Sequence, residues 1–407
     1  QAALCPEPGP VGYSTNYHRR PLAKELPDPG GDMRITVLGE RGSDDRRVAI
    51  TPEAVETLVA EGHRVIVESG AGDGIGAVDG AYQSAGAETA SGPSLLDGGG
   101  LVVGIDPLES VGDHGFSSDH VVVGLLDPVW RPDRAAALAA TGATGLSLDL
   151  VPRTTRAQTV DVLSSMATVA GFQAVLLAAV RLPKMFPLLI TAAGTVPPAR
   201  VLVLGAGVAG LQAVATARRL GAVVEGFDIR SEALEQIRSL GGRSIEPPLG
   251  ADGGAPDAVR IHEVLAPHVA DSDVVVATAQ IPGRRSPLLV TADMVAAMRP
   301  GSLVIDLAVE RGGNCEVSRA DVDVDHHGVT VLAPTNLASG SALTASRMFA
   351  TNLLNLVRML DRDGEAFVDP DDEVLAGMLV VAGGNVVHPV VREAQAQQSP
   401  PSEMRTL

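Results

Sequence analysis

Three glycines stand at a spacing that lets a peptide chain bind a phosphate group. Gly205, Gly207 and Gly210 follow the apolar run Val201–Leu204 and precede an alanine-rich segment with helical spacing. The first glycine permits a sharp turn, the second lets the backbone approach a pyrophosphate, and the third lets a helix pack closely on a strand. The amides around Ala206–Ala209 would then face the phosphates with the positive end of the helix dipole.

A second apolar run and an acidic residue extend this pattern. Ala222–Phe227 has the composition of a buried strand and ends at Asp228, whose carboxylate can accept hydrogen bonds from both hydroxyls of a ribose. Strand, helix, strand and acid follow one another as in a βαβ dinucleotide-binding unit, which we favour over a purely structural glycine turn. Because a carboxylate repels a 2′-phosphate, the sequence predicts NAD rather than NADP. Arg230 could attract such a phosphate, but Asp228 holds the more direct position.

A polar stretch further upstream carries a second set of candidate ligands. PRTTRAQTVDVLSS places Arg153, Gln158, Asp161 and Ser164 just before an apolar helical segment. Arg153 offers a fixed positive charge to a phosphate or carboxamide, and Gln158 offers both a donor and an acceptor. Asp161 and Ser164 are three residues apart and hence on one helix face, where they can orient a carboxamide. The alternative is that Gln158 and Asp161 only cap the helix.

The surrounding chain alternates short apolar runs with helical segments, which is typical of α/β folds with doubly wound parallel sheets. A helix is expected after Thr51 and Pro52, which suit an N-cap and a first turn, and another at Trp130–Ala140. Two longer helices are expected at Thr159–Arg181 and Ser341–Leu360. Further strands are expected at Ile35–Leu38, His63–Glu68, Leu101–Ile105, His120–Leu126, Val274–Thr278, Leu303–Leu307 and Val329–Leu332.

The two long helices divide the chain into two Rossmann-like domains with a cleft between them. Residues 1–32 are rich in Pro and Gly and are expected to form a flexible extension. Residues 33–155 plus 350–407 are expected to form a first, discontinuous α/β domain, closed by Glu365–Val391. Residues 156–349 are expected to form the NAD-binding Rossmann domain. Ligands of such folds bind outside the carboxyl ends of the strands, which here would meet at the cleft.

The bulk composition excludes several classes of partner. The 407 residues carry 31 basic and 49 acidic side chains, a formal net charge of −18, so neither nucleic acid nor an anionic membrane surface is expected to bind directly. The two cysteines fit a reducing cytoplasm, and Cys315 is expected to be a packed thiol rather than a nucleophile. The uncharged run Val162–Val180 has apolar residues at helical spacing, which favours a buried helix over a membrane span.

One cluster of acidic and histidine side chains resembles a metal site. Asp321, Asp323 and Asp325 alternate and are followed by His326 and His327. They lead directly into a glycine and a strand, so we interpret the cluster as a solvated turn, and no metal site is predicted.

Longer segments carry a resemblance to a known family. The chain resembles the NAD(H)-binding domain of proton-translocating nicotinamide nucleotide transhydrogenase in the segments RAQTVDVLSSMATVAGFQAVLLAA, LPKMFPLLITAAGTVPPARVLVLGAGVAGLQA, IPGRRSPLL and DLAVERGGNCE. The resemblance extends from about Met33 to Val391, and alanine dehydrogenase shares the same architecture. It implies that the nicotinamide end of NAD(H) is held by Arg153, Gln158, Asp161 and Ser164. The other nucleotide contacts that it implies are Thr154, Thr155, Thr159, Val160, Gly205, Ala206, Gly207, Val208, Gly210, Asp228, Ile229, Arg230 and Gln280.

Two positions depart from the family pattern. Gln280 stands where the family usually has an aliphatic residue. The loop that closes over the nucleotide in the family should lie near Leu249–Ala255, where this chain is shorter than usual and has no tyrosine.

The residues that distinguish the two branches of the family favour the transhydrogenase. Alanine dehydrogenases require a Lys at the end of an early strand and a later His, to bind and protonate pyruvate. The matching stretches LVVGIDP and VVVGLLDP have Gly104 and Leu126–Asp127 there. The Arg46–Arg47 pair could bind a carboxylate, but it does not by itself complete an acid–base site.

The resemblance therefore implies an enzyme that transfers hydride directly between NAD(H), held by this chain, and NADP(H), held by a partner subunit. It also implies coupling to proton translocation through membrane-spanning partner subunits, a homodimer, and a cytoplasmic chain associated peripherally with the inner membrane. Direct transfer between two nicotinamide rings needs apposition and exclusion of water but no protein acid or base. The alternatives are an alanine dehydrogenase-like oxidoreductase and a non-catalytic NAD(H)-binding module.

Overall fold

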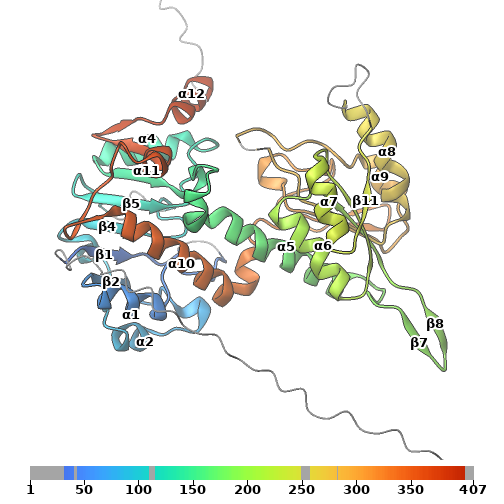
Figure 1. Cartoon of the computed structure of the whole chain (residues 1–407), viewed down its shortest axis with the longest axis horizontal. Coiled ribbons are helices and arrows are strands. Elements are labelled where there is room, and N and C mark those ends of the chain that lie inside the picture. Colours follow the sequence, from blue (N-terminus) through green and yellow to red (C-terminus); the bar gives the residue numbers. More distant parts are fainter. Residues whose placement is uncertain (1–31, 41–43, 110–114, 249–256, 282, 399–407) are drawn as a thin grey trace, which may run out of the picture.

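The computed structural model describes residues 32–40, 44–109, 115–248, 257–281 and 283–398. The chain forms two lobes, each built around its own sheet, with a long helix running from one lobe to the other (Figure 1). This arrangement confirms the predicted α/β class with two parallel-dominated sheets. The predicted extension is described only at Asp32, and the predicted loop Leu249–Ala255 lies outside the described residues.

The first lobe is built on an eight-stranded sheet of order β19-β18-β6-β5-β4-β1-β2-β3. Its six N-terminal strands run parallel, whereas β18 pairs antiparallel with β6. The C-terminal strands β18 and β19 therefore complete one edge of this sheet. The strands are β1 (Arg34–Val37), β2 (Arg64–Glu68), β3 (Glu88–Ala90), β4 (Gly100–Val103), β5 (His120–Gly124), β6 (Thr144–Ser147), β18 (Leu379–Ala382) and β19 (Asn385–Val386).

The second lobe is built on a seven-stranded sheet of order β11-β10-β9-β12-β13-β15-β14. Its first six strands are parallel and follow the 3-2-1-4-5-6 order of dinucleotide-binding folds, whereas β14 is an antiparallel edge strand. The strands are β9 (Arg200–Leu204), β10 (Val223–Phe227), β11 (Arg243–Ile245), β12 (Val274–Ala277), β13 (Leu303–Asp306), β14 (Val324–His326) and β15 (Val329–Leu332).

The acidic cluster that we interpreted as a solvated turn contains a short strand, β14. The segment is a short strand between two turns, since Asp321 and His327 both have a backbone φ of 55°. The Asp321 carboxylate accepts hydrogen bonds from the amide and hydroxyl of Thr335. Within the described ranges no group of three or more His, Cys, Asp or Glu residues could hold a metal ion.

The helices cover both faces of the two sheets. Helix α1 begins at Pro52 with Thr51 at its N-cap position, as expected, and α10 follows the expected range closely. The helices are α1 (Pro52–Ala60), α2 (Asp79–Ser84), α4 (Pro132–Thr141), α5 (Val162–Arg181), α6 (Val208–Arg219), α7 (Ser231–Ser239), α8 (Ala258–Asp271), α9 (Ala292–Ala296), α10 (Ala342–Leu360), α11 (Glu373–Met378) and α12 (Pro389–Gln398).

Helix α5 is shared by the two lobes. Its first half buries Val162, Met166 and Val169 in the core of the first lobe, and its second half buries Ala174 and Ala178 in the core of the second. The helix begins later than the expected Thr159, because residues 156–160 form a 3-10 turn. By length and composition α5 could also cross a membrane, with 39% of its most apolar window buried in the structure. Helix α5 packs in both cores, so its contacts do not assign it to one domain. The predicted domain boundary between residues 155 and 156 therefore stays a prediction.

A two-stranded hairpin projects from the second lobe, away from both cores (Figure 1). It consists of β7 (Leu189–Thr191) and β8 (Gly194–Val196), within the segment Phe186–Pro198 for which the sequence predicted no element. Two of its apolar side chains face solvent, with Ile190 77% and Val196 39% exposed.

Helices α5 and α6 meet through backbone at Gly171. A Cβ added there would lie far inside contact distance of the carbonyl oxygen of Ala209, in the first turn of α6. Gly171 therefore holds the first turn of α6 directly against α5.

We expect Gly171→Ala to lower the free energy of unfolding by about 1–3 kcal/mol, because neither backbone can move aside without repacking. Gly80→Ala is the matched control, since Gly80 also lies in a helix but has nothing within 4 Å of an added Cβ. Chemical denaturation of both variants measures the difference. Equal stability of the two variants would show that the helix pair has room for a side chain.

Candidate nucleotide-binding site

The three glycines after β9 have different surroundings. Gly205 has a φ of 91°, and a Cβ there would lie 2.9 Å from the amide nitrogen of Ala279. A Cβ on Gly210 would overlap the carbonyl oxygen of Gly205. Gly207 has nothing within 4 Å of an added Cβ and an extended backbone. Packing thus explains the first and third glycines, whereas the second faces open space at the start of α6, where a phosphate could approach.

Asp228 lies at the carboxyl end of β10, next to the glycine loop. Its carboxylate accepts hydrogen bonds from the amide of Ala206 at 2.8 Å and from the amide of Arg230 at 3.0 Å. The Arg230 guanidinium adds two more, each at 2.9 Å. Burial would raise the pKa of the Asp228 carboxyl, but these hydrogen bonds outweigh it and hold the pKa below its ordinary value. Asp228 is therefore ionised at neutral pH, with Arg230 on its solvent side.

The polar stretch before α5 is packed on the first lobe, where Ala157 and Val160 belong to its core. Asp161 caps α5, because its carboxylate accepts hydrogen bonds from the Ser164 amide at 2.9 Å and the Ser164 hydroxyl at 2.6 Å. Asp161 therefore caps the helix, and its role toward a nucleotide stays a prediction. The side chains of Arg153 and Gln158 are exposed, as are those of Thr155 and Thr159.

Two residues of the expected set have limited access to a ligand. The Val160 side chain is fully buried in the first core, so only its backbone could touch a nucleotide. Thr154 is half-buried, and its hydroxyl accepts a 3.4 Å hydrogen bond from the amide of Ala157.

The remaining expected residues line the carboxyl edge of the second sheet. Ala206 is buried, whereas the side chains of Val208 and Ile229 are exposed. Gln280 follows β12, and its amide group donates a 3.0 Å hydrogen bond to the carbonyl oxygen of Leu307. The Gln280 side chain is exposed.

The turn after β13 supports this edge of the sheet through buried hydrogen bonds. Asp306 is fully buried, and its carboxylate accepts hydrogen bonds from the amides of Ala308, Asn314 and Cys315. The Asn314 side chain bonds both the amide and the carbonyl of Ala279, each at 2.9 Å. Cys315 is buried, and burial raises the pKa of its thiol to about 11, so it is a packed thiol as expected.

The structure also pairs two residues that the sequence did not single out as partners. Arg311 follows β13 in the second lobe, and Asp127 follows β5 in the first. The Arg311 guanidinium donates to both carboxylate oxygens of Asp127, at 2.9 and 3.2 Å. The only signal for this contact is that both residues come just after buried parallel strands, whose carboxyl ends face the other lobe.

The first lobe has a cavity of about 370 Å³ at the carboxyl ends of β1 and β2. Glu40 lines it and accepts hydrogen bonds from the amides of Ile105 at 2.7 Å and Asp106 at 3.0 Å. Burial raises the pKa of the Glu40 carboxyl to about 7, although the two amides oppose the shift. Of the neighbouring arginines, Arg47 is paired with Asp45.

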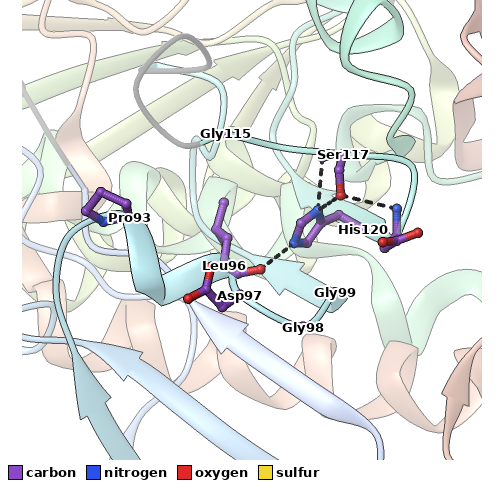
Figure 2. Close-up of a pocket in the computed structure, with 9 residues that line it drawn as sticks. Pro93, Leu96, Asp97, Gly98, Gly99, Gly115, Ser117 and His120 are labelled. Atoms are coloured by element: carbon purple, nitrogen blue, oxygen red, sulfur yellow. Dashed lines mark hydrogen bonds between the residues drawn. The ribbon is translucent and has the colours of Figure 1, made fainter.

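A second cavity, of about 320 Å³, lies at the opposite edge of the same sheet, where β4 and β5 begin (Figure 2). His120 lies in its wall with Nδ1 3.0 Å from both the amide and the hydroxyl of Ser117 and Nε2 3.0 Å from the carbonyl oxygen of Leu96. Both ring nitrogens are thus engaged in holding the loops together. This edge is remote from the carboxyl ends of the strands, where ligands of such folds bind.

The protonation of Glu40 gives the chain a testable pH dependence. Its pKa is raised on folding, so its contribution to stability is full below about pH 4.5 and is lost as the pH rises through about 7. Relative to Glu40→Gln, which does not titrate, the free energy of unfolding of the natural chain should fall by about 2–3 kcal/mol from about pH 5 to about pH 8. Urea denaturation of both proteins at both pH values measures this difference in the free energy of unfolding. Parallel pH profiles would show that Glu40 titrates as an exposed carboxyl does.

Comparisons with known proteins agree with this geometry. Residues 36–170 match the N-terminal domain and residues 174–389 the C-terminal domain of the alanine dehydrogenase/PNT family. An NAD(P) transhydrogenase alpha subunit of Rhodospirillum rubrum is 40% identical over 384 residues, covering 88% of this chain and 99% of that protein.

Solved structures give the same result. A transhydrogenase from Sinorhizobium meliloti superposes with a TM-score of 0.79 at 39% identity, over 87% of this chain and 100% of that one. An L-alanine dehydrogenase superposes with a TM-score of 0.76 at 28% identity, over 90% and 99%. The chain therefore belongs to the alanine dehydrogenase/PNT family.

Proposed function

We propose that this chain is the NAD(H)-binding alpha subunit of a proton-translocating NAD(P) transhydrogenase. The observation that carries the proposal is the glycine loop after β9, in which Gly207 faces open space beside the ionised carboxylate of Asp228. This loop lies on a sheet with the strand order of dinucleotide-binding folds. The 40% identity to the Rhodospirillum rubrum transhydrogenase subunit supports the choice within the family.

The residues of the second lobe fit the adenosine and phosphate groups of NAD. The backbone at Gly205, Ala206, Gly207 and Val208 would meet the pyrophosphate, with Gly210 allowing the helix to approach. Asp228, Ile229 and Arg230 would surround the adenosine ribose. To accept the ribose hydroxyls, Asp228 must release or share the hydrogen bonds that Arg230 now donates. Gln280 would lie beside the same loop, because the hydroxyl of Thr278, two residues before it, donates a 3.0 Å hydrogen bond to the carbonyl oxygen of Gly205.

The segment before α5 fits the other end of the cofactor. Arg153 and Gln158 are exposed and can bind a carboxamide or phosphate, while Asp161 and Ser164 share one helix face. Thr154, Thr155, Thr159 and Val160 would line the same segment. Asp161 lies ten residues before Gly171, where α6 meets α5, so the two groups of ligands are separated by about 15 Å along the helix. An extended dinucleotide could reach both.

The bound nicotinamide supplies the hydride acceptor or donor, and the protein supplies its position. Such a transfer to NADP(H) on a partner subunit needs alignment of two rings and exclusion of water, not a general acid. The positions that an alanine dehydrogenase would use support this choice, since Gly104 has no side chain and Leu126 is buried.

The subunit would work in a larger assembly. The relatives are named as alpha subunits of a transhydrogenase, which implies other subunits in their complexes. We propose that a second copy of this chain covers the exposed apolar side chains of α5 and of the β7–β8 hairpin, which include Phe172, Val180, Ile190 and Val196. Membrane-spanning subunits would hold the dimer at the cytoplasmic side of the inner membrane.

Hydride transfer with the partner tests the proposed activity. The purified chain is mixed with an NADP(H)-binding transhydrogenase subunit, and reduction of an NAD analogue by NADPH is followed by absorbance. We expect transfer only when both proteins are present. Tight NADH binding without transfer would leave a non-catalytic binding module, and NADH oxidation by this chain alone with pyruvate and ammonia would identify an alanine dehydrogenase.

Gly207→Ala tests the glycine loop directly. The added methyl group meets no protein atom, so stability should stay within about 0.5 kcal/mol of the natural chain. It would occupy the space where a pyrophosphate approaches the backbone, so the Kd for NADH should rise at least about tenfold, or about 1.4 kcal/mol. Fluorescence titration with NADH measures this, with Gly80→Ala as control. Unchanged affinity would place the nucleotide elsewhere.

A further inference from the structure

The Arg311–Asp127 ion pair crosses from one lobe to the other. Among the ion pairs between described residues, it is the one that joins a loop after a strand of one sheet to a loop after a strand of the other. Its two hydrogen bonds form a bidentate contact, and the side chains are only 26% and 15% exposed. Such a contact fixes both distance and orientation, which a single hydrogen bond does not.

The carboxylate of Asp127 is held rigidly on the side of the first lobe. Asp127 has a φ of 49°, a left-handed conformation uncommon outside glycine, in which Asp and Asn are the favoured exceptions. Its amide donates a 2.8 Å hydrogen bond to the carboxylate of Asp149, which also accepts one from the Ser147 hydroxyl at 2.8 Å. Asp149 precedes Arg153 by four residues, so this anchor lies at the entrance of the proposed nicotinamide segment.

On the side of the second lobe Arg311 is anchored through its backbone, whose carbonyl accepts a 2.7 Å hydrogen bond from the amide of Ser286. Its guanidinium lies 5.3 Å from the centroid of the Trp130 ring, which, like Asp127, belongs to the first lobe. Arg311 ends a 3-10 turn whose following residues are tied to the buried Asp306. Through Asn314 that turn is bonded to Ala279, and the hydroxyl of the preceding Thr278 donates a 3.0 Å hydrogen bond to the carbonyl of Gly205 in the glycine loop.

A continuous set of contacts therefore joins the two halves of the proposed dinucleotide site. It runs from Asp149 through Asp127 and Arg311 to Asn314, and then to the residue beside Gly205. We propose that Arg311 and Asp127 are positioning residues, which set the separation between the nicotinamide-binding segment and the phosphate-binding loop. They touch each other, and they act on the cofactor only through the loops that they hold. This inference rests on the proposed NAD(H) site.

The proposal distinguishes ligands that use both lobes from ligands that use one. NADH spans the two groups of residues, whereas 5′-AMP reaches only the glycine loop and Asp228. Breaking the ion pair should therefore raise the Kd for NADH about tenfold and change the Kd for 5′-AMP by less than twofold. A general loss of structure would instead weaken the binding of both ligands by similar factors.

The variants are Arg311→Gln, Asp127→Asn and the two combined. Asparagine suits the left-handed backbone at position 127, so the loop keeps its conformation. If the two residues act as one unit, the double variant should bind NADH no more weakly than either single variant. Arg358→Gln is the matched control, because it removes an ion pair with Glu61 that lies within the first lobe. Arg358→Gln should bind both ligands as the natural chain does.

Isothermal titration with NADH and with 5′-AMP measures all of these affinities, and thermal unfolding confirms that each variant is folded. Equal losses for the two ligands, no loss for NADH, or additive losses in the double variant would overturn the positioning role. If the natural chain itself fails to bind NADH, the proposed function fails first. If it binds NADH but transfers no hydride, the proposed hydride-transfer activity is wrong, but the NADH and 5′-AMP affinities still test the positioning role.

Discussion

The structure depends on one helix having its two halves buried in two different cores. The first half of α5 packs with α10 in the first lobe, and the second half packs under β9 and β13 in the second. Neither core is complete without it, so the lobes cannot separate without exposing apolar surface on both sides. The polar segment before α5 and the glycine loop beside α6 are therefore held by the same rigid element, one at its start and the other next to Gly171 at its middle.

How much of this structure could be predicted depends on how far apart in the sequence the interacting residues lie. The βαβ unit was predictable because each glycine answers a local need, and the packing at Gly205 and Gly210 bears this out. Continuous apolar runs identified most of the central strands, since parallel strands are buried on both faces, but the interior strand β6, whose sequence is TGLS, was missed. Short edge strands such as β3, β11 and β14 were missed, because three residues give too little pattern to recognise.

The site was less predictable than the fold, because its decisive contacts join distant residues. Arg311 and Asp127 are 184 positions apart, and nothing local to either one indicates the pairing. The capping of α5 by Asp161 was foreseen as an alternative, since it depends only on a residue three positions away. That Arg230 covers Asp228 was not foreseen, although the two residues are near neighbours in sequence, because spacing alone does not show which acceptor a flexible arginine selects.

The contact between Arg230 and Asp228 bears on how quickly a nucleotide could leave. A ribose arriving at Asp228 finds every carboxylate oxygen already supplied with donors, so its hydroxyls exchange one set of hydrogen bonds for another. The net gain from such an exchange is small compared with filling an unsatisfied acceptor. When the ribose departs, the guanidinium can return and restore the lost contacts at once. The adenosine end of the nucleotide would then bind with little net gain in hydrogen-bond energy, which suits rapid exchange of the nucleotide rather than long residence.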